Sequence, residues 1–216
     1  EPSDFSRHDW LRMIVLAPFG LNHLKKTKYL VIEMGTDGPE PPANMEYLLT
    51  IVKPDYAIFL NAAPAHTLQF SQALTDSQKK LPDKQRLGEI QKVIAAEDGK
   101  IITQSGCKVA IYSQSDRFMR GEIEKYLATK PPVKALAIGK DLEILEWRVD
   151  LKGTMFKLKL EGGDGVNIDI PRFVLPEEYG ETLGSAVLLG KELGLSSEQI
   201  SYSLVRNFEL PLGRST

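Results

Sequence analysis

Two polar residues stand at the ends of two apolar, β-prone runs, and together their side chains could bind a metal ion. Glu33 lies near the end of the run Tyr29–Gly35, and His66 ends the segment Asn61–His66, just past the next such run. In an open parallel sheet, ligands gather at the carboxyl ends of neighbouring strands. A carboxylate suits Mg²⁺, which keeps several waters and bridges phosphates, whereas imidazole is a less usual ligand for this ion. The pair predicts a metal–phosphate site, although each residue by itself is more typical of a structural role.

The residues around this pair predict a sheet covered by helices. Apolar runs without alternation indicate buried strands at Tyr29–Met34, Tyr56–Asn61, Val109–Ser113 and Ala135–Gly139. Apolar residues at helical spacing predict helices at Asn44–Val52, Glu89–Ala96 and Arg117–Ala128. The segments Gly35–Pro42 and Thr75–Gln85 are rich in breakers or polar residues and are expected to be loops. Strands that alternate with helices in this way predict a doubly wound, mostly parallel α/β sheet with flanking helices.

After Gly139 the pattern changes to alternating apolar and polar residues. Three such segments predict a small antiparallel meander with one solvent-facing side, at Leu142–Asp150, Thr154–Leu160 and Val166–Ile170. Two helices are expected to follow, at Thr182–Leu193 and Ser197–Phe208. Ser197 is the predicted N-cap of the second helix, and Gly194 is the predicted C′ residue of the first.

Composition limits the classes of partner. The chain has 216 residues, 42% of them hydrophobic and 26% charged, as in an ordinary soluble globular protein. A net charge of −2 gives no electrostatic reason to expect nucleic acid or an anionic membrane as a partner. The single cysteine, Cys107, fits a reducing compartment. The longest apolar stretch, Met13–Leu21, is far short of a membrane helix, and no signal peptide is visible. We therefore expect a cytoplasmic protein.

Three motifs resemble the central domain of the Mur ligases, which are ATP-dependent amide-forming enzymes of peptidoglycan synthesis. They are Glu-Met-Gly at Glu33–Gly35, Tyr-Leu-Leu-x-Ile-Val-Lys-Pro-Asp at Tyr47–Asp55 and Asn-x-x-Pro-Ala-His at Asn61–His66. They are most similar to the branch that adds D-alanyl-D-alanine. Leu193-Gly194-Leu195 and Pro211-Leu212-Gly213-Arg214 resemble the passage from the central to the C-terminal domain.

The resemblance implies a chemistry and a set of partners. Glu33 and His66 would help to hold Mg²⁺ at the phosphates of ATP. ATP would phosphorylate a substrate carboxylate, and an amine would then attack the acyl phosphate. The parent enzyme would join D-Ala-D-Ala to a UDP-MurNAc-tripeptide. Residues 1–209 would be the central domain, with an α/β core at 1–139 and 171–209 and the meander at 140–170, and residues 210–216 would be a linker.

Three departures from the family pattern matter for this expectation. First, the chain contains no Gly-x-x-x-x-Gly-Lys-Ser/Thr phosphate loop. Second, Asp98 stands where the family has a carbamylated lysine; Asp98 or Glu97 could supply the missing anion, and a surface role at a helix end is the alternative. Third, Glu178–Thr182 replaces the family's adenine-contacting helix start, which leaves Thr182 as a hydroxyl and Tyr179 as a ring that could stack on a base or simply pack.

Two weaker cofactor-binding candidates complete the set. Asn61 is expected to fix the loop before His66 through backbone hydrogen bonds, and Arg214 resembles the family's linker arginine. Without the phosphate loop and a C-terminal domain, we expect the fragment alone to be inactive, with weak or no ATP binding. The alternative is a degenerate, non-catalytic Mur-ligase-like domain that serves as a binding or scaffold module. Retention of both Glu33 and His66 argues against that alternative.

Overall fold

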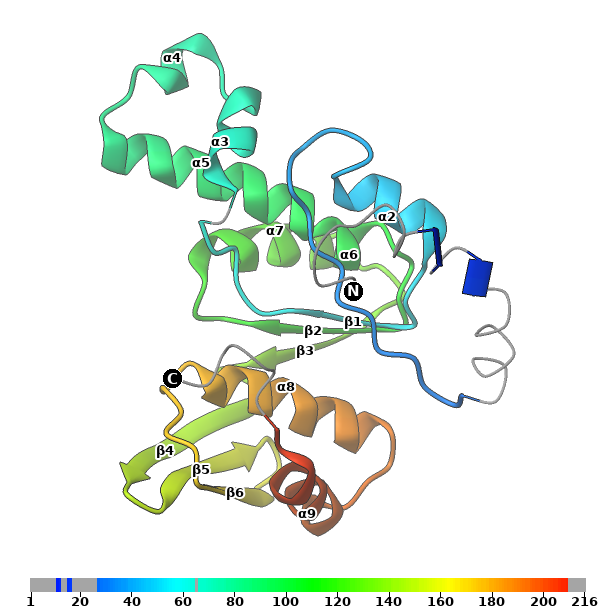
Figure 1. The fold of residues 1–216 in the computed structure, drawn as a ribbon, viewed down its shortest axis with the longest axis vertical. Helices are drawn as coiled ribbons and strands as arrows, with labels where there is room; N and C mark the ends of the chain where they lie inside the picture. The colour runs from blue at the N-terminus through cyan, green and yellow to red at the C-terminus, as the bar shows by residue number, and fades with distance from the viewer. Residues whose placement is uncertain (1–10, 13–14, 17–26, 65, 210–216) are drawn as a thin grey trace. The chain divides into compact units, whose positions relative to one another are not determined.

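The computed structural model describes residues 11–12, 15–16, 27–64 and 66–209 (Figure 1). The chain divides into two compact units, Glu1–Met34 and Gly35–Thr216. In the first unit, Leu11, Arg12, Val15 and Leu16 are helical, and residues 27–34 form neither helix nor strand.

The predicted buried strand at Tyr29–Met34 is therefore wrong. The segment forms no ladder, and its apolar side chains are exposed: 49% for Tyr29, 60% for Leu30, 90% for Val31 and 44% for Ile32. An apolar run shows that a segment would suit a buried strand, but a strand exists only where a neighbour supplies the hydrogen bonds. The sequence pattern shows that a segment suits a buried strand, but it does not show whether a neighbouring strand is present.

The second unit is built on one mixed sheet of six strands in the order β1-β2-β3-β4-β5-β6. The first three strands are parallel neighbours: β1 (Tyr56–Phe59), β2 (Val109–Ser113) and β3 (Lys134–Ile138). All five residues of β2 are buried, as expected for a central strand without alternation. The predicted α/β sheet with flanking helices is confirmed, and its strands after β1 agree with the predicted segments to within one or two residues.

The meander continues the same sheet. Its strands are β4 (Leu142–Asp150), β5 (Gly153–Leu160) and β6 (Gly165–Pro171), paired antiparallel. One bridge, Ile138 to Leu142, joins β4 to the parallel part. In β6, buried and exposed residues alternate strictly. The predicted meander is thus correct, and it extends the parallel sheet rather than standing beside it.

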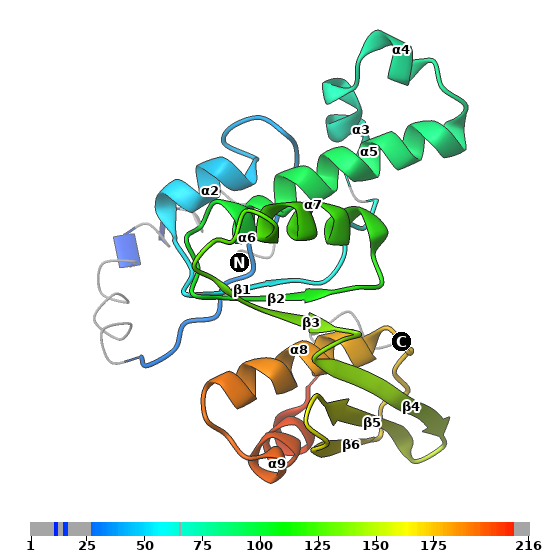
Figure 2. The ribbon, with the colours of Figure 1, turned by 180° about the vertical axis from the view of Figure 1, so that it is seen from behind.

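Helices cover both faces of the parallel strands (Figures 1 and 2). One face carries α2 (Met45–Ile51), α5 (Asp83–Asp98), α6 (Lys100–Thr103) and α7 (Arg117–Leu127). The other face carries α8 (Tyr179–Glu192), beside which lies α9 (Ser197–Asn207). Each face has its own apolar core; fully buried members include Ala110, Met119 and Ile123 on the first, and Ile111, Leu142 and Val187 on the second.

The segment Thr75–Gln85 is not the predicted loop. It contains α4 (Asp76–Lys79) and the first turn of α5, which begins at Asp83 after Pro82. Thr75 and Gln78 form a capping box, in which the Thr75 hydroxyl accepts the backbone N–H of Gln78 and the Gln78 amide accepts that of Thr75. Two short elements, α3 (Thr67–Phe70) and the 3₁₀ helix η1 (Ser71–Ala73), precede it.

The ends of α8 and α9 show which capping predictions are right. Gly194 has φ +83° and, with Leu195, donates N–H groups to the carbonyls of Lys191 and Gly190, which is a Schellman motif. The predicted C′ residue is thus confirmed. The predicted N-cap of α9 is wrong by one residue: Ser196 caps it, in a capping box with Gln199, and Ser197 is its first residue.

Among the described residues, no helix combines the length and the apolar character that a membrane crossing requires.

Candidate functional site

His66 lies in the connection that leaves the carboxyl end of β1. The loop runs from Leu60 to His66, and His66 is the residue before α3, with φ +50°. Its carbonyl accepts the N–H groups of Gln69 and Phe70. Phe70 is 1% exposed and anchors α3 in the core beside α5. The imidazole itself is half exposed, so a ligand from solvent can reach it.

The loop at the start of the second unit reaches His66. Gly35–Ala43 closes on itself, because the N–H groups of Asp37 and Gly38 both donate to the carbonyl of Ala43. A Cβ at Gly38 would lie 3.4 Å from Cβ of Gln69, so this loop touches α3. The Asp37 carboxylate lies 3.3 Å from Nε2 of His66. The predicted loop Gly35–Pro42 is confirmed, and its Asp37 places an acidic side chain beside the histidine.

Asp98, the last residue of α5, faces the same place. The hydroxyl of Thr36 donates a 2.5 Å hydrogen bond to Oδ1 of Asp98. Burial raises the pKa of the Asp98 carboxyl, and the charge of Glu97 raises it further. The Thr36 hydroxyl and the charge of His66 lower this pKa and so oppose burial. His66 and Asp98, 32 positions apart in the sequence, are therefore close enough to interact electrostatically.

Glu97 and Asp98, which the sequence left as alternatives for the missing anion, have different partners in the structure. Glu97 is 7% exposed, and its Oε1 accepts the backbone N–H of Met45 at 2.9 Å. Its Oε2 lies 2.8 Å from Nζ of Lys100. The carboxylate of Glu97 thus satisfies the first N–H of α2 and pairs with a lysine. Of the two acids, Asp98 is the one hydrogen-bonded to Thr36, whose neighbour Asp37 lies beside His66.

Sequence reasoning missed two further polar groups at this sheet edge. Asp116 caps α7 by accepting the N–H groups of Phe118 and Met119, and its second oxygen accepts the N–H of Ala62 at 2.8 Å. Ser113, at the end of β2, donates a 2.8 Å hydrogen bond to Glu181 in the first turn of α8. An aspartate directly before a helical run is a readable N-cap signal, but its bond to a residue 54 positions away is not.

The remaining predicted site residues have separate surroundings. Glu33 is exposed and belongs to the unit Glu1–Met34. Asn61 is exposed, and the next residue, Ala62, donates its backbone N–H to the carboxylate of Asp116. Thr182 is exposed on α8. Tyr179 packs against the core of that face, which agrees with the packing alternative and not with a free ring. Arg214 lies outside the described residues.

The side chains near His66 include oxygen ligands of the kind that a hard cation prefers, but they do not form a complete set of ligands. Asp37, His66 and Asp98 offer two carboxylates and an imidazole, yet no three His, Cys, Asp or Glu residues in the described ranges are arranged to hold a metal ion. A complete protein cage is not what Mg²⁺ requires, because it is usually held by one or two carboxylates together with water and substrate phosphates. Two carboxylates beside an imidazole are thus a donor set that could share such an ion with a bound phosphate.

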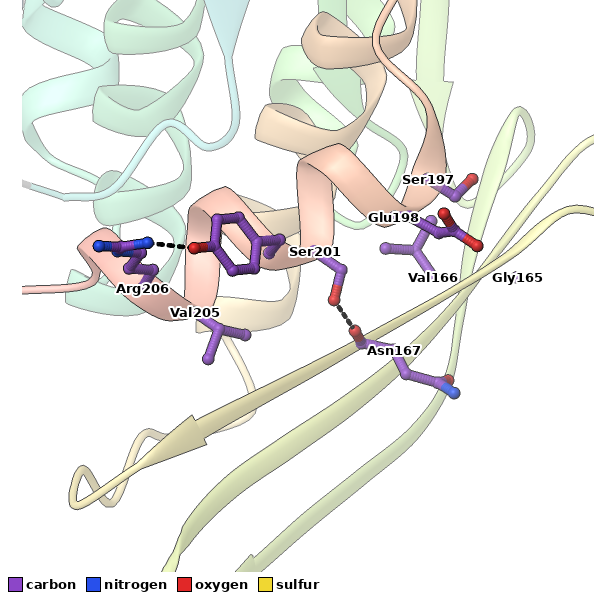
Figure 3. A pocket seen from close by; sticks show the side chains of 9 residues that line it. Gly165, Val166, Asn167, Ser197, Glu198, Ser201, Val205 and Arg206 are labelled. Carbon is purple, nitrogen blue, oxygen red and sulfur yellow. Dashed lines mark hydrogen bonds between the residues drawn. The ribbon is translucent and has the colours of Figure 1, made fainter.

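A pocket of about 560 Å³ lies elsewhere in the unit, between β6 and α9 (Figure 3). Val166 and Val205 line it, and the Ser201 hydroxyl donates to the carbonyl of Asn167 on the strand. The guanidinium of Arg206 donates a hydrogen bond to the hydroxyl of Tyr202, one turn earlier in the helix. Because β6 and β1 are at opposite edges of the sheet, this pocket is separate from the His66 site.

Comparison with known proteins gives a fold. The chain matches no protein-family model and no curated protein sequence. Among solved structures, a point mutant of Lactobacillus casei folylpolyglutamate synthetase matches with a TM-score of 0.60 and 14% identity, over 88% of this chain and 41% of that one. A complex of a folylpolyglutamate synthetase with AMPPCP matches with a TM-score of 0.59 and 16% identity, over 88% of this chain and 42% of that one. MurF from Acinetobacter baumannii matches with a TM-score of 0.58 and 22% identity, over 86% of this chain and 35% of that one.

The chain thus spans about two fifths of the length of the solved proteins that it resembles. At these identities the likeness concerns the arrangement of helices and strands. The mixed six-stranded sheet with helices on both faces is the fold of the Mur ligase and folylpolyglutamate synthetase type.

Proposed function

We propose that this chain is the central domain of an ATP- and Mg²⁺-dependent ligase that joins a carboxylate to an amine in peptidoglycan precursor synthesis. One observation carries the proposal: the loop that follows Glu33, the histidine after β1 and the acid at the end of α5 meet at one place. The specific reaction proposed is addition of D-Ala-D-Ala to a UDP-MurNAc-tripeptide. Residues 1–209 form the domain in this proposal, and residues 210–216 lead out of it.

The reaction has two balanced steps. The γ-phosphoryl group of ATP passes to an oxygen of the substrate carboxylate, which gives ADP and an acyl phosphate. The amine then attacks the acyl carbon, the C–O bond to phosphate breaks, and an amide, phosphate and a proton result. A bound Mg²⁺ would neutralise charge on the phosphate oxygens.

Each candidate residue has one task in this scheme. His66 and Glu33 hold the metal, and Asp98 adds negative charge beside them. Asn61, Thr182 and Arg214 are proposed to contact nucleotide.

The test is Mg²⁺-dependent ATP hydrolysis and amide formation by the complete protein with UDP-MurNAc-tripeptide and D-Ala-D-Ala. Glu33→Gln and His66→Ala are expected to lower the rate by at least about tenfold, the smallest effect usual at a metal centre. Asp98→Asn is expected to lose the Mg²⁺-dependent activity as well. Asp150→Asn is the matched control, since Asp150 accepts the N–H of Lys152 in the β4–β5 turn, away from the site. Wild-type rates in both the Glu33 and His66 variants would refute the proposal.

For the chain alone, calorimetry is expected to show weak or no ATP binding. It contains no phosphate loop whose backbone N–H groups would cradle the phosphates. A micromolar dissociation constant would contradict this expectation.

One observation favours the alternative of a non-catalytic binding or scaffold module. The carboxylate at the proposed anion position is bonded to Thr36 and partly buried, so it is less accessible than a ligand on a long stem. If the complete protein hydrolyses no ATP with any substrate while still binding a cell-wall precursor, the scaffold role is supported and the ligase role fails.

A further inference from the structure

We infer that Asp116 is a positioning residue for the site, because its carboxylate fixes the loop that presents His66. This inference rests on the proposed function, since it takes His66 as the metal ligand. It assigns a role to a residue that lies on a different element, well beyond His66 along the chain.

The His66 loop has two fixed points. At its start, Ala62 is 0% exposed and donates its N–H to Oδ2 of Asp116 at 2.8 Å. At its end, Phe70 is 1% exposed and inserts into the core beneath α3. Between these points, Ala63, Pro64 and His66 are exposed. The position of the imidazole therefore depends on both anchors.

Asp116 is itself held rigidly. Its Oδ1 accepts N–H groups from Phe118 at 2.8 Å and from Met119 at 3.1 Å. Met119 is 0% exposed in the core between α7 and the sheet. One carboxylate thus joins the first turn of a buried helix to the loop after β1, and each oxygen has its own task. Capping α7 needs only one acceptor oxygen, so the bond from the second oxygen to Ala62 is an additional contact.

The left-handed backbone conformation of His66 is the reason that the bond from Ala62 to Asp116 matters for the position of the imidazole. A non-glycine residue at φ +50° carries a backbone cost, and it persists where surrounding contacts determine it. The bond from Ala62 to Asp116 is one of the contacts that hold the chain on this path. Without it, the loop can relax and move the imidazole away from Asp37 and Asp98.

The variant Asp116→Asn separates the two tasks. Asparagine has a single acceptor oxygen, which the two α7 N–H groups keep, and its amide group then faces the N–H of Ala62 as donor to donor. Asp116→Ser is the second variant: its shorter hydroxyl caps α7 but does not reach Ala62. Asp150→Asn is again the matched control, because its turn lies on the β4–β5 hairpin.

The experiment uses NMR of the chain, first without metal and then with Mn²⁺ as the probe. In both variants, we expect the amides of Phe118 and Met119 to keep their protection. The Ala62 amide should exchange about tenfold faster, the loss of one hydrogen bond to a charged group. The ring signals of His66 and the amide signal of Gln69 should shift. Mn²⁺ affinity, read from broadening of the His66 ring, should fall several-fold to about tenfold.

Two results would overturn the inference: unchanged exchange of Ala62, or faster exchange of Ala62 with His66 and Gln69 signals identical to wild type. Failure of the proposed function looks different. If the complete protein shows no Mg²⁺-dependent ATP hydrolysis, the proposed function fails, and the metal-free signals of His66 still decide whether Asp116 positions the loop.

Discussion

Replacing Glu97 by alanine should destabilise the second unit strongly, because this side chain joins two elements from inside the fold. Its Oε1 accepts the N–H of Met45, which is 2% exposed, and its Oε2 pairs with Lys100. Alanine would leave a buried N–H without an acceptor, which costs about 1–3 kcal/mol. It would also leave Lys100, whose side chain is only 21% exposed, without its nearer partner. Breaking a largely buried pair costs about 3–5 kcal/mol, and we expect a loss in that range.

Two further variants make this prediction specific. Glu97→Gln keeps an acceptor for Met45 and loses only the charge opposite Lys100, so its cost should be smaller, about 1–2 kcal/mol. Glu46 also pairs with Lys100, at 3.4 Å, but its side chain is 67% exposed. Glu46→Ala should therefore cost about 0–1 kcal/mol and is the matched control.

The assay is urea unfolding of the four proteins, with free energies from linear extrapolation. The order of stability should be wild type, Glu46→Ala, Glu97→Gln and Glu97→Ala. If Glu97→Ala is no less stable than Glu46→Ala, the buried carboxylate does not connect α2 to the end of α5, and the reasoning is refuted.

Two predictions concern other positions. Burial raises the pKa of Asp98 above its reference value of 3.8, so the folded state binds more protons than the unfolded state, and the free energy of unfolding should fall as pH rises through that interval. Asp98→Asn should lack this fall, so its stability relative to wild type should be higher at about pH 7 than at about pH 3 in denaturant titrations; equal differences at both values would contradict it. Gly153→Ala should cost about 2 kcal/mol or more in thermal unfolding, since φ is +151° and the new Cβ would lie 2.2 Å from the carbonyl oxygen of Ile170. Gly162→Ala, with φ +98° and no atom within 4 Å of the new Cβ, should cost only the backbone term of about 1 kcal/mol, and equal losses would refute the packing argument.

The elements that sequence predicts well are those whose signals are local. The alternation in Leu142–Asp150 gives β4 with its observed bounds, and the apolar run Val109–Ser113 gives β2. Gly194 marks the end of α8 because only a residue that tolerates positive φ closes a Schellman motif easily. In each case the residues that decide the conformation are neighbours in the chain.

The errors have two different causes. Composition predicts a loop at Thr75–Gln85, although Thr75 and Gln78 carry a capping box that a search for helix starts would find. The strand at Tyr29–Met34 fails for a deeper reason, because no local pattern names the strand that would pair with it. The same limit applies at the site. The position after an apolar run selects His66, and the resemblance to the Mur ligases selects Asp98, but the contacts of Thr36, Asp37 and Asp116 depend on the folded topology.

The three acids around the end of α5 and the start of α7 illustrate why residue type alone does not assign a role. Glu97, Asp98 and Asp116 are all carboxylates near one sheet edge, yet each one's partners differ. Glu97 accepts the N–H of Met45 with one oxygen and pairs with Lys100 through the other, which fixes the start of α2. Asp116 accepts N–H groups of α7 with one oxygen and the N–H of Ala62 with the other, which fixes the loop after β1. Within the described part of the chain, Asp98 is hydrogen-bonded to a threonine hydroxyl through one oxygen, and burial raises its pKa. Of these three acids, Asp98 is therefore the one for which we propose a role beside the metal, whereas Glu97 and Asp116 stabilise the backbone at α2 and after β1.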